Sequence, residues 1–513
     1  MISSRPDRVE IGAGPLTPEA YHAVADGRAK VGLSDVGRRR MLAFRASLMR
    51  QLSAGVRMYG VNTGYGADSV RTLAPDVIRT VQRNTVLSHA MGVGPETPRE
   101  IVRGMMLLKA NVMAIGNSAV RPELAELLLE LLNHDLIPLV PEQGSLAASG
   151  DLVPSGHVAL AVIGEGDVMD AGKRTPAREA MRGAGLRELV LEEKEGLALV
   201  NGTAFTEAYA LAATYRAGQL LKVADIAGAA SLLALRGHPE AFAHRAVSLR
   251  PHPGSLRCAA NLRDLTSGSD LTGEGSGRIH DPYCLRCMPQ VHGASRDAFA
   301  YVRDAVVVEL NSFTDNPLVF QSDDSWVSAG NFHAQPIGLP MDSLAVLVAE
   351  LASISQRRTQ HLVAPVYDVG LPPKLSRHAD EGMGLFMLNT TAAALVSENK
   401  ALSFPASVDS MAVDTTEDHV SMGSVAARKA MSIVGNTAHV LALELVCACQ
   451  AIELHAPLLP SRPVTAVLTA VRRHVPFVDE DRPLSAEVAA LAGAILSGEI
   501  AAAVESELGR SLD

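Results

Sequence analysis

The chain has 513 residues, of which 47% are hydrophobic and 20% are charged, so it is long enough to bury a large core. Aromatic residues make up only 4%, and a core of Ala, Val, Leu and Met suits close helix packing better than a β-sandwich. The formal net charge is −10 without a cluster of Lys and Arg, which argues against nucleic acid as a partner, and the odd number of cysteines, five, favours free thiols over a disulfide framework.

Eight stretches show the apolar spacing of helices. The stretch 204–236 is apolar nearly all round, and a helix without a polar face must be buried. Several such helices predict an all-α fold with a long central helical bundle, extended by a partner subunit. The predicted helices are 98–115, 122–134, 204–236, 295–313, 339–362, 384–402, 422–455 and 485–508.

Charges interrupt every long apolar run, so we expect no membrane-spanning segment; Arg103 and Lys109 are examples. The N-terminal segment "MISSRPDRVEIGAG" has no apolar run behind its charges, which is not the pattern of a secretory signal. These features predict a cytoplasmic protein. Cys284 and Cys287 have the spacing of zinc ligands, but only Cys447-Ala-Cys449 could complete such a site, so we expect no metal.

Loops rich in Gly, Asn, Asp and Pro separate the helical stretches, and function tends to lie on such loops. None of them matches a P-loop, a dinucleotide fingerprint, a zinc-protease motif or a hydrolase elbow. The loops span residues 58–69, 140–157, 266–293 and 314–336.

Nine segments of these loops and their flanks, taken together, resemble the aromatic amino acid ammonia-lyases, and among them the histidine ammonia-lyases most. They follow one another in the order of that family from about residue 58 to residue 455. The resemblance implies the ammonia-lyase/fumarase-like architecture. The segments are "YGVNTGYG", "VLSHAMGVG", "ASGDLVP", "KEGLALVNGT", "DPYCLRCMPQVHG", "TDNPLVF", "GNFHAQP", "LVSENKALSFPASVDS" and "EDHVSMG".

In that family an Ala-Ser-Gly segment cyclises into an electrophilic methylidene-imidazolone (MIO), and the matching residues are Ala148, Ser149 and Gly150. Glycine permits the cramped backbone that this closure requires, and Ser149 supplies the methylene by losing its hydroxyl. The resemblance assigns Asp151 a part in this maturation. The electrophile captures the substrate amine and makes it a better leaving group, so no external cofactor is expected.

The resemblance also assigns roles around the electrophile. Tyr59 matches the catalytic base, in a glycine-flanked loop. Tyr283 matches the residue that assists the electrophile, and Arg286 the clamp on the substrate carboxylate, a task that suits its planar guanidinium. Asn201 matches an asparagine beside the electrophile, and Phe332 an aromatic wall near it.

Two positions point to an imidazole substrate. Ser88-His89 is the pattern of the histidine enzymes, whereas enzymes for phenylalanine or tyrosine carry a bulky apolar residue or a His-Leu pair there. Glu417 replaces the glutamine of those enzymes, and a carboxylate can pair with an imidazole ring. Departures from the family pattern at His280, Cys284 and Thr416 lie on loops expected near the substrate.

The expected reaction is therefore elimination of ammonia from L-histidine to give trans-urocanate. Alternatives are a histidine 2,3-aminomutase or a tyrosine or phenylalanine ammonia-lyase on the same electrophile, and, more remotely, a scaffold without turnover. The resemblance implies a homotetramer whose active sites draw on more than one subunit. We expect one functional module, with the base loop and electrophile in 1–200 and the long-helix bundle with C-terminal helices in 201–513.

Overall fold

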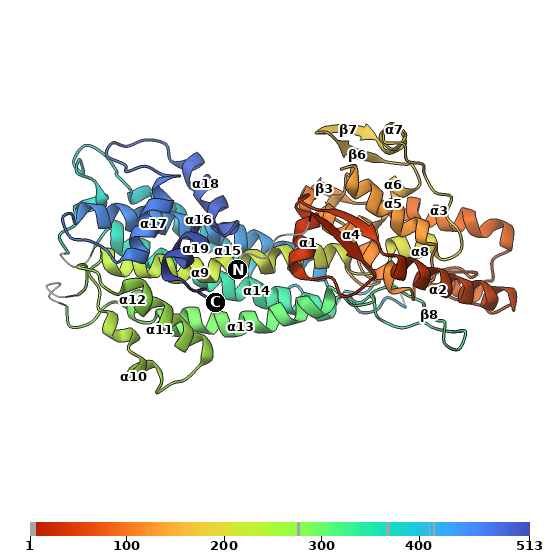
Figure 1. Cartoon of the computed structure of the whole chain (residues 1–513), viewed down its shortest axis with the longest axis horizontal. Coiled ribbons are helices and arrows are strands. Elements are labelled where there is room, and N and C mark those ends of the chain that lie inside the picture. The colour runs from red at the N-terminus through yellow and green to blue at the C-terminus, as the bar shows by residue number, and fades with distance from the viewer. Residues whose placement is uncertain (1–6, 274–277, 366–368, 410, 414–415) are drawn as a thin grey trace. The chain divides into compact units, whose positions relative to one another are not determined.

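The computed structural model describes residues 7–273, 278–365, 369–409, 411–413 and 416–513. Helices form most of this structure and the strands are short (Figure 1), which confirms the all-α prediction. The helices are α1 (Pro18–Ala25), α2 (Asp35–Ser53), α3 (Ile78–His89), α4 (Arg99–Ile115), α5 (Pro122–Asn133), α6 (Leu152–Val162), α7 (Ala177–Gly183), α8 (Glu195–Val200), α9 (Ala204–Ala234), α10 (His244–Val247), α11 (Pro253–Thr266), α12 (Tyr283–Arg286), α13 (Met288–Glu309), α14 (Gln335–Val363), α15 (Phe386–Leu402), α16 (Gly423–Leu454), α17 (Arg462–Arg472), α18 (Ser485–Leu496) and α19 (Glu499–Leu508).

The strands form small sheets of two or three members. β1 and β2 are parallel, with Arg8 opposite Lys30, and the other pairs are antiparallel. β6 and β7 lie beside α7 (Figure 1). The strands are β1 (Arg8–Ile11), β2 (Lys30–Leu33), β3 (Val93–Glu96), β4 (Ile137–Pro138), β5 (Pro141–Gln143), β6 (Asp167–Asp170), β7 (Lys173–Pro176), β8 (Leu318–Phe320) and β9 (Ser325–Val327).

The described chain divides into two compact units. Unit 1 comprises residues 1–212, 304–341 and 405–428, and unit 2 comprises 213–303, 342–404 and 429–513. Four of the five unit boundaries fall within the four longest helices, α9, α13, α14 and α16, and the fifth, after residue 404, lies in the loop that follows α15. The grouping of 1–200 and 201–513 by function stays a prediction.

Three long helices have the length and apolar composition that a membrane span requires. They are α9, α14 and α16, and 83%, 67% and 78% of their most apolar windows lie buried inside the protein. In α9 most residues are buried, as expected for a helix that is apolar nearly all round, although Tyr215 is exposed. The burial of these helices accounts for their composition.

Buried polar side chains in unit 2 are joined in one hydrogen-bonded network. Arg358 and Glu444 are fully buried and make a bidentate ion pair, with nitrogen–oxygen distances of 2.5 and 2.9 Å. His292 lies between Arg358 and Asp225, and its Nδ1 is 2.8 Å from an Asp225 oxygen. Burial lowers the pKa of His292. Cys258 completes a metal-ligand-like cluster with Asp225 and His292, but the adjacent guanidinium groups disfavour a cation there.

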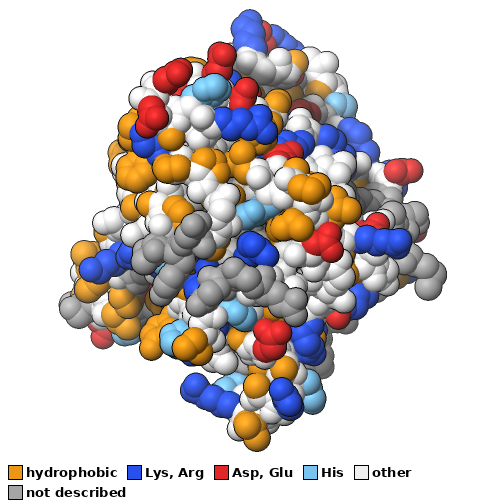
Figure 2. Space-filling model, turned by 90° about the vertical axis from the view of Figure 1, so that its left-hand side faces the viewer, with side chains coloured by type: hydrophobic (Ala, Val, Ile, Leu, Met, Phe, Trp, Pro, Cys, Tyr) orange, Lys and Arg blue, Asp and Glu red, His pale blue; other side chains and the backbone are white. Residues whose placement is uncertain are grey.

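Exposed charges of both signs and apolar side chains are intermingled on the face that Figure 2 shows. Neither basic nor acidic side chains dominate this face, in line with the sequence composition.

Candidate active site

A cavity in unit 1 is lined by six of the thirteen predicted site residues: Tyr59, His89, Ser149, Asn201, Phe332 and Glu417. Its volume is about 310 Å³, which suits a small ligand. Loops form its walls together with residues of helices α3, α6 and α8, and these parts come from far apart in the sequence. It is lined by Tyr59, Tyr65, Gly66, Ser69, Thr85, His89, Ser149, Leu152, Leu197, Asn201, Asn316, Ser328, Phe332, Thr416 and Glu417.

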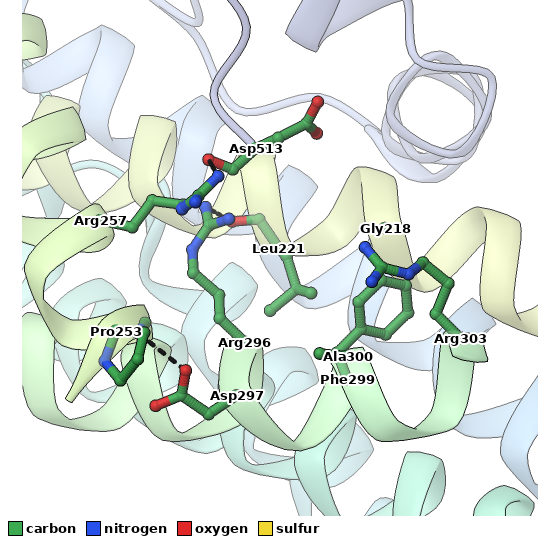
Figure 3. Close-up of a pocket in the computed structure, with 11 residues that line it drawn as sticks. Gly218, Leu221, Pro253, Arg257, Arg296, Asp297, Phe299, Ala300, Arg303 and Asp513 are labelled. Carbon is green, nitrogen blue, oxygen red and sulfur yellow. Dashed lines mark hydrogen bonds between the residues drawn. The ribbon is translucent and has the colours of Figure 1, made fainter. Parts of the chain in front are cut away.

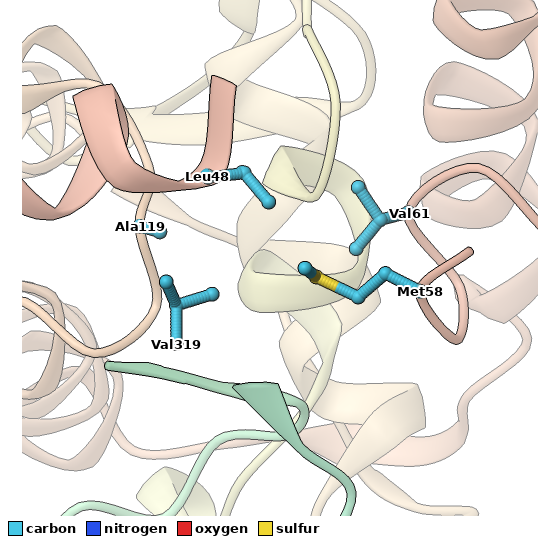
Figure 4. Close-up of a cluster of buried hydrophobic side chains, with 5 residues drawn as sticks. All are labelled: Leu48, Met58, Val61, Ala119 and Val319. Carbon is cyan, nitrogen blue, oxygen red and sulfur yellow. The ribbon is translucent and has the colours of Figure 1, made fainter. Parts of the chain in front are cut away.

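The loop that carries Tyr59 is anchored on both sides by buried apolar side chains. Met58 and Val61 are fully buried and belong to a cluster with Leu48, Ala119 and Val319 (Figure 4). Tyr59 lies between Met58 and Val61, and its hydroxyl accepts a hydrogen bond from the backbone of Gly66 at 3.3 Å. Burial of the flanking residues therefore fixes the base of the loop while the tyrosine itself lines the cavity.

The Ala-Ser-Gly segment has a cramped backbone. Gly150 has a φ of +79°, and a Cβ atom there would lie 2.3 Å from the carbonyl oxygen of Gly202. Gly150 and Gly202 form a parallel bridge, and the amide of Asp151 donates to the Gly202 carbonyl at 2.7 Å. Only glycine fits position 150, because any side chain would collide with the neighbouring backbone.

Ser149 and Glu417 meet in the cavity although 268 residues separate them. The Ser149 hydroxyl donates to Glu417 Oε1 at 2.8 Å. Ser149 is only partly buried, so a small molecule in the cavity can reach it, whereas Ala148 is 7% exposed.

Asp151 lies fully buried at the start of α6 and accepts hydrogen bonds from three donors. They are the Ser145 hydroxyl at 2.8 Å, the Thr206 backbone amide at 2.7 Å and the Thr206 hydroxyl at 2.9 Å. Burial raises the pKa of the Asp151 carboxyl, and the hydrogen bonds oppose this change. Asp151 thereby ties the Ala-Ser-Gly loop to the first turn of α9.

Asn201 is oriented by a buried polar cluster. Its side-chain amide donates to the Asn316 carbonyl at 3.0 Å and to Asp315 at 3.3 Å. Asp315 is held in turn by Lys194, whose ammonium group lies 2.8 Å from a carboxylate oxygen. Because the side-chain nitrogen of Asn201 donates both hydrogen bonds, its side-chain oxygen is the atom that can accept a hydrogen bond at the cavity wall.

His89 and Ser88 end helix α3 but differ in position. His89 lines the cavity, and its Nδ1 lies 2.7 Å from the Thr85 carbonyl. Because a carbonyl only accepts, Nδ1 carries the proton, and Nε2 of the neutral ring is an acceptor. Ser88 donates to the Thr85 carbonyl at 3.2 Å and does not line the cavity.

Three predicted residues belong to unit 2. Tyr283 and Arg286 begin and end the short helix α12, and the guanidinium carbon lies 4.9 Å from the centre of the tyrosine ring. Tyr283 is 72% exposed, and His280 is exposed as well. Their parts in the active site stay predictions.

Several cavity residues were not singled out from the sequence. Tyr65 is the clearest case: its hydroxyl accepts from Thr85 at 2.9 Å and from Gln82 at 3.4 Å. Burial raises its pKa. The signal was present, since Tyr65 shares the glycine-rich loop of Tyr59, and Asn316 stands in the segment "TDNPLVF".

Size alone does not identify the active site, because unit 2 contains a larger cavity of about 460 Å³ (Figure 3). It is lined by Arg257, Arg296 and Arg303 with Asp297 and Asp513, and it contains none of the predicted site residues. Arg257 donates to the Asp513 carbonyl at 2.6 Å.

The fold and the cavity, with its constrained Ala-Ser-Gly loop, define an aromatic amino acid lyase. A sequence model of the family "Aromatic amino acid lyase" matches residues 16–473, and the chain belongs to this family. The chain is 44% identical over 506 residues to a histidine ammonia-lyase of Sorangium cellulosum, covering 96% of this chain and 98% of that one. It is 45% identical to that of Anaeromyxobacter dehalogenans, covering 94% and 98%.

Solved structures agree with this assignment. A histidine ammonia-lyase from Trypanosoma cruzi superimposes with a TM-score of 0.90 at 35% identity, over 98% of this chain and 95% of that one. A tyrosine aminomutase from Streptomyces globisporus superimposes with a TM-score of 0.92 at 32% identity, over 99% and 100%. Lyases and aminomutases thus share this fold.

Proposed function

We propose that this protein is a histidine ammonia-lyase, which eliminates ammonia from L-histidine to give trans-urocanate. The observation that carries the proposal is the hydrogen bond of 2.8 Å between Ser149 and Glu417 in a cavity that also contains Tyr59 and His89. A carboxylate beside the serine of the Ala-Ser-Gly loop suits a substrate with an imidazole ring.

The residues Ala148, Ser149 and Gly150 fit a methylidene-imidazolone formed from the chain itself. The close approach of Gly202 to position 150 supports this, because it admits only glycine, the residue whose backbone permits the bend that ring closure requires. The group supplies an electrophile that captures the substrate amine and makes it a better leaving group. No external cofactor is part of the proposal.

Tyr59 acts as the base that removes the β-proton of the substrate. Its side chain lines the cavity, between the buried anchors Met58 and Val61. Asn201, held by Asn316 and Asp315, is oriented to bind polar atoms near Ser149.

Glu417 and His89 select the imidazole ring. The Glu417 carboxylate accepts a hydrogen bond from a ring N–H, and His89, whose Nδ1 is held by the Thr85 carbonyl, lines the same cavity. Phe332 packs against the ring face from the segment before α14. A substrate with a phenyl or phenol ring leaves the Glu417 carboxylate without this partner.

Tyr283 and Arg286 complete the proposed set, with Tyr283 assisting the electrophile and Arg286 binding the substrate carboxylate. The proposal includes a homotetramer with shared active sites, in which these residues and Ser149 need not come from one chain. An active monomer in size-exclusion chromatography with light scattering would contradict this part. A cytoplasmic location is also proposed.

The deciding experiment is a proton NMR time course of the purified protein with L-histidine. We expect the vinylic signals of urocanate, and none from the Ser149→Ala variant. Signals of β-histidine would instead identify an aminomutase, the alternative that the likeness to a tyrosine aminomutase favours. An unchanged spectrum with L-histidine, and turnover of L-tyrosine or L-phenylalanine, would overturn the substrate assignment.

A further inference from the structure

Two carboxyl groups, those of Asp151 and Glu207, are buried behind the Ala-Ser-Gly loop, and that of Glu309 is half-buried near them. Asp151 accepts from Thr206, Glu207 is the next residue of α9 and 2% exposed, and Glu309 accepts from the Thr203 hydroxyl at 2.8 Å. Burial raises the pKa of all three carboxyls, and their mutual repulsion raises those of Glu207 and Glu309 further. The cluster therefore favours protonated carboxyls unless a cation compensates.

Lys109 of α4 is the cation that acts on Asp151. It is 4% exposed, and its ammonium group donates to the carbonyl of Asn201, whose neighbour Gly202 bridges to Gly150. Its charge opposes the rise in the pKa of Asp151. Burial lowers the pKa of Lys109 to about 8, against the pull of Asp315 and Asp151.

Lys109 and Glu207 both line one small cavity. It offers about 10 Å³ to the centre of a water molecule, which is close to the room that one water needs. Its lining includes Lys109, Ser118 and Glu207. The Ser118 hydroxyl and Glu207 Oε1 are buried there, and neither has a hydrogen-bond partner among the described residues. Two such atoms and an ammonium group are the surroundings in which a buried water is stable.

We propose that this cavity binds one water molecule, in contact with Lys109 and a protonated Glu207. Lys109, the water and Glu207 together keep one positive charge behind the Asn201–Gly202 peptide. Because of this charge, Asp151 is ionised when the Ala148–Gly150 segment cyclises. This inference rests on the proposed function, which requires that closure. Lys109 and Glu207 are positioning residues, because they act through Asp151.

The chemistry requires a base at the first step. The nitrogen of Gly150 bonds to the carbonyl carbon of Ala148, and its proton passes to the Asp151 carboxylate. The Ala148 oxygen leaves as water with that proton and the amide proton of Ser149. The Cα proton and side-chain hydroxyl of Ser149 leave as a second water. Asp151 returns the protons that it takes, so no outside reagent is consumed.

Mass spectrometry of the peptide 144–157 tests the proposal without measuring turnover. We expect the wild-type peptide to lack the mass of two water molecules, and most Lys109→Met and Lys109→Gln molecules to retain it. Lys109→Arg and Glu207→Gln should mature, because the first keeps the charge and the second is a permanently neutral carboxyl mimic. Lys222→Met, at a half-buried lysine of unit 2, is the control.

A pH shift separates this role from a structural one. Raising the pH of folded Lys109→Met favours the ionised form of Asp151 and should restore the loss of two waters, whereas a misfolded loop would not respond. Glu207 and Glu309 also face Asp151, and their ionisation opposes this rescue. The double variant with Glu207→Gln should therefore mature at a lower pH than Lys109→Met.

Each outcome bears on a different claim. Full maturation of Lys109→Met at pH 7 overturns the inference, as does a folded variant that stays immature at every pH. Lys109→Gln carries the same test if Lys109→Met does not fold. A wild-type peptide of full mass would instead overturn the proposed function and the inference together.

Discussion

Replacing Glu417 by glutamine removes a negative charge from the cavity and keeps a side chain of nearly the same size. Before the loop cyclises, the amide oxygen of the new side chain still accepts a hydrogen bond from the Ser149 hydroxyl, which lies 2.8 Å from Glu417 Oε1 in the unaltered chain. What disappears is the charge-assisted hydrogen bond to the imidazole N–H of the substrate. Such a bond contributes about 1.5–3 kcal/mol. With tenfold in rate for about 1.4 kcal/mol, kcat/KM for L-histidine should fall about ten- to a hundredfold.

The assay compares two substrates of the same variant. Formation of urocanate gives kcat/KM for L-histidine, and formation of the corresponding acrylate gives it for L-phenylalanine or L-tyrosine. We expect the second value to change by less than about threefold, because a ring without N–H makes no bond to the carboxylate. Glu480→Gln, an exposed position in unit 2, is the matched control and should change neither. Equal losses for both substrates would refute the assignment of Glu417 to the imidazole ring.

Four further changes test other parts of the structure. Tyr59→Phe should lower kcat by about 10²–10⁴-fold while urocanate still binds, and unchanged turnover would remove Tyr59 as the base. Gly150→Ala places a Cβ atom 2.3 Å from the Gly202 carbonyl, so its loop peptide should keep its full mass in mass spectrometry. Phe205→Ala empties a fully buried position and should cost about 3–5 kcal/mol in urea unfolding, where a cost near zero would contradict the packing. The pKa of Lys109 is lowered from 10.5 to about 8, so the unfolded chain binds more protons between these values. Wild-type stability should then fall relative to Lys109→Met, by up to about 3 kcal/mol, as the pH is lowered from 10.5 to 8, and parallel curves would contradict the buried charge.

The helical elements were largely predictable, because apolar spacing is a local property. The stretches 98–115 and 122–134 correspond to α4 and α5 within a residue. The sequence predicts one helix over 485–508, but this stretch forms α18 and α19, bent by 58° at a break that contains Gly498. Gly498 has a φ of +86°, which ends one helix and starts the next.

The predicted start of the helix α14 is wrong by four residues. The pattern predicts a helix over 339–362, which already includes Pro340, whereas α14 begins four residues earlier, at Gln335. Pro336 occupies the first turn, where its missing N–H costs nothing, but Pro340 lies inside the helix, where a proline usually marks a boundary. Helices α2 and α3 were not predicted, because their polar faces leave a narrow apolar stripe.

By itself the sequence determined the helical class and the residue types of the loops, because both depend on neighbours along the chain. It placed Ser149 between Ala148 and Gly150, and Glu417 in its own segment. Only the tertiary structure decided that these side chains meet across 268 residues, and that Lys109 and Glu207 line one small cavity behind the loop. Such contacts depend on how whole helices pack, and no local periodicity encodes the distance between two side chains on different helices.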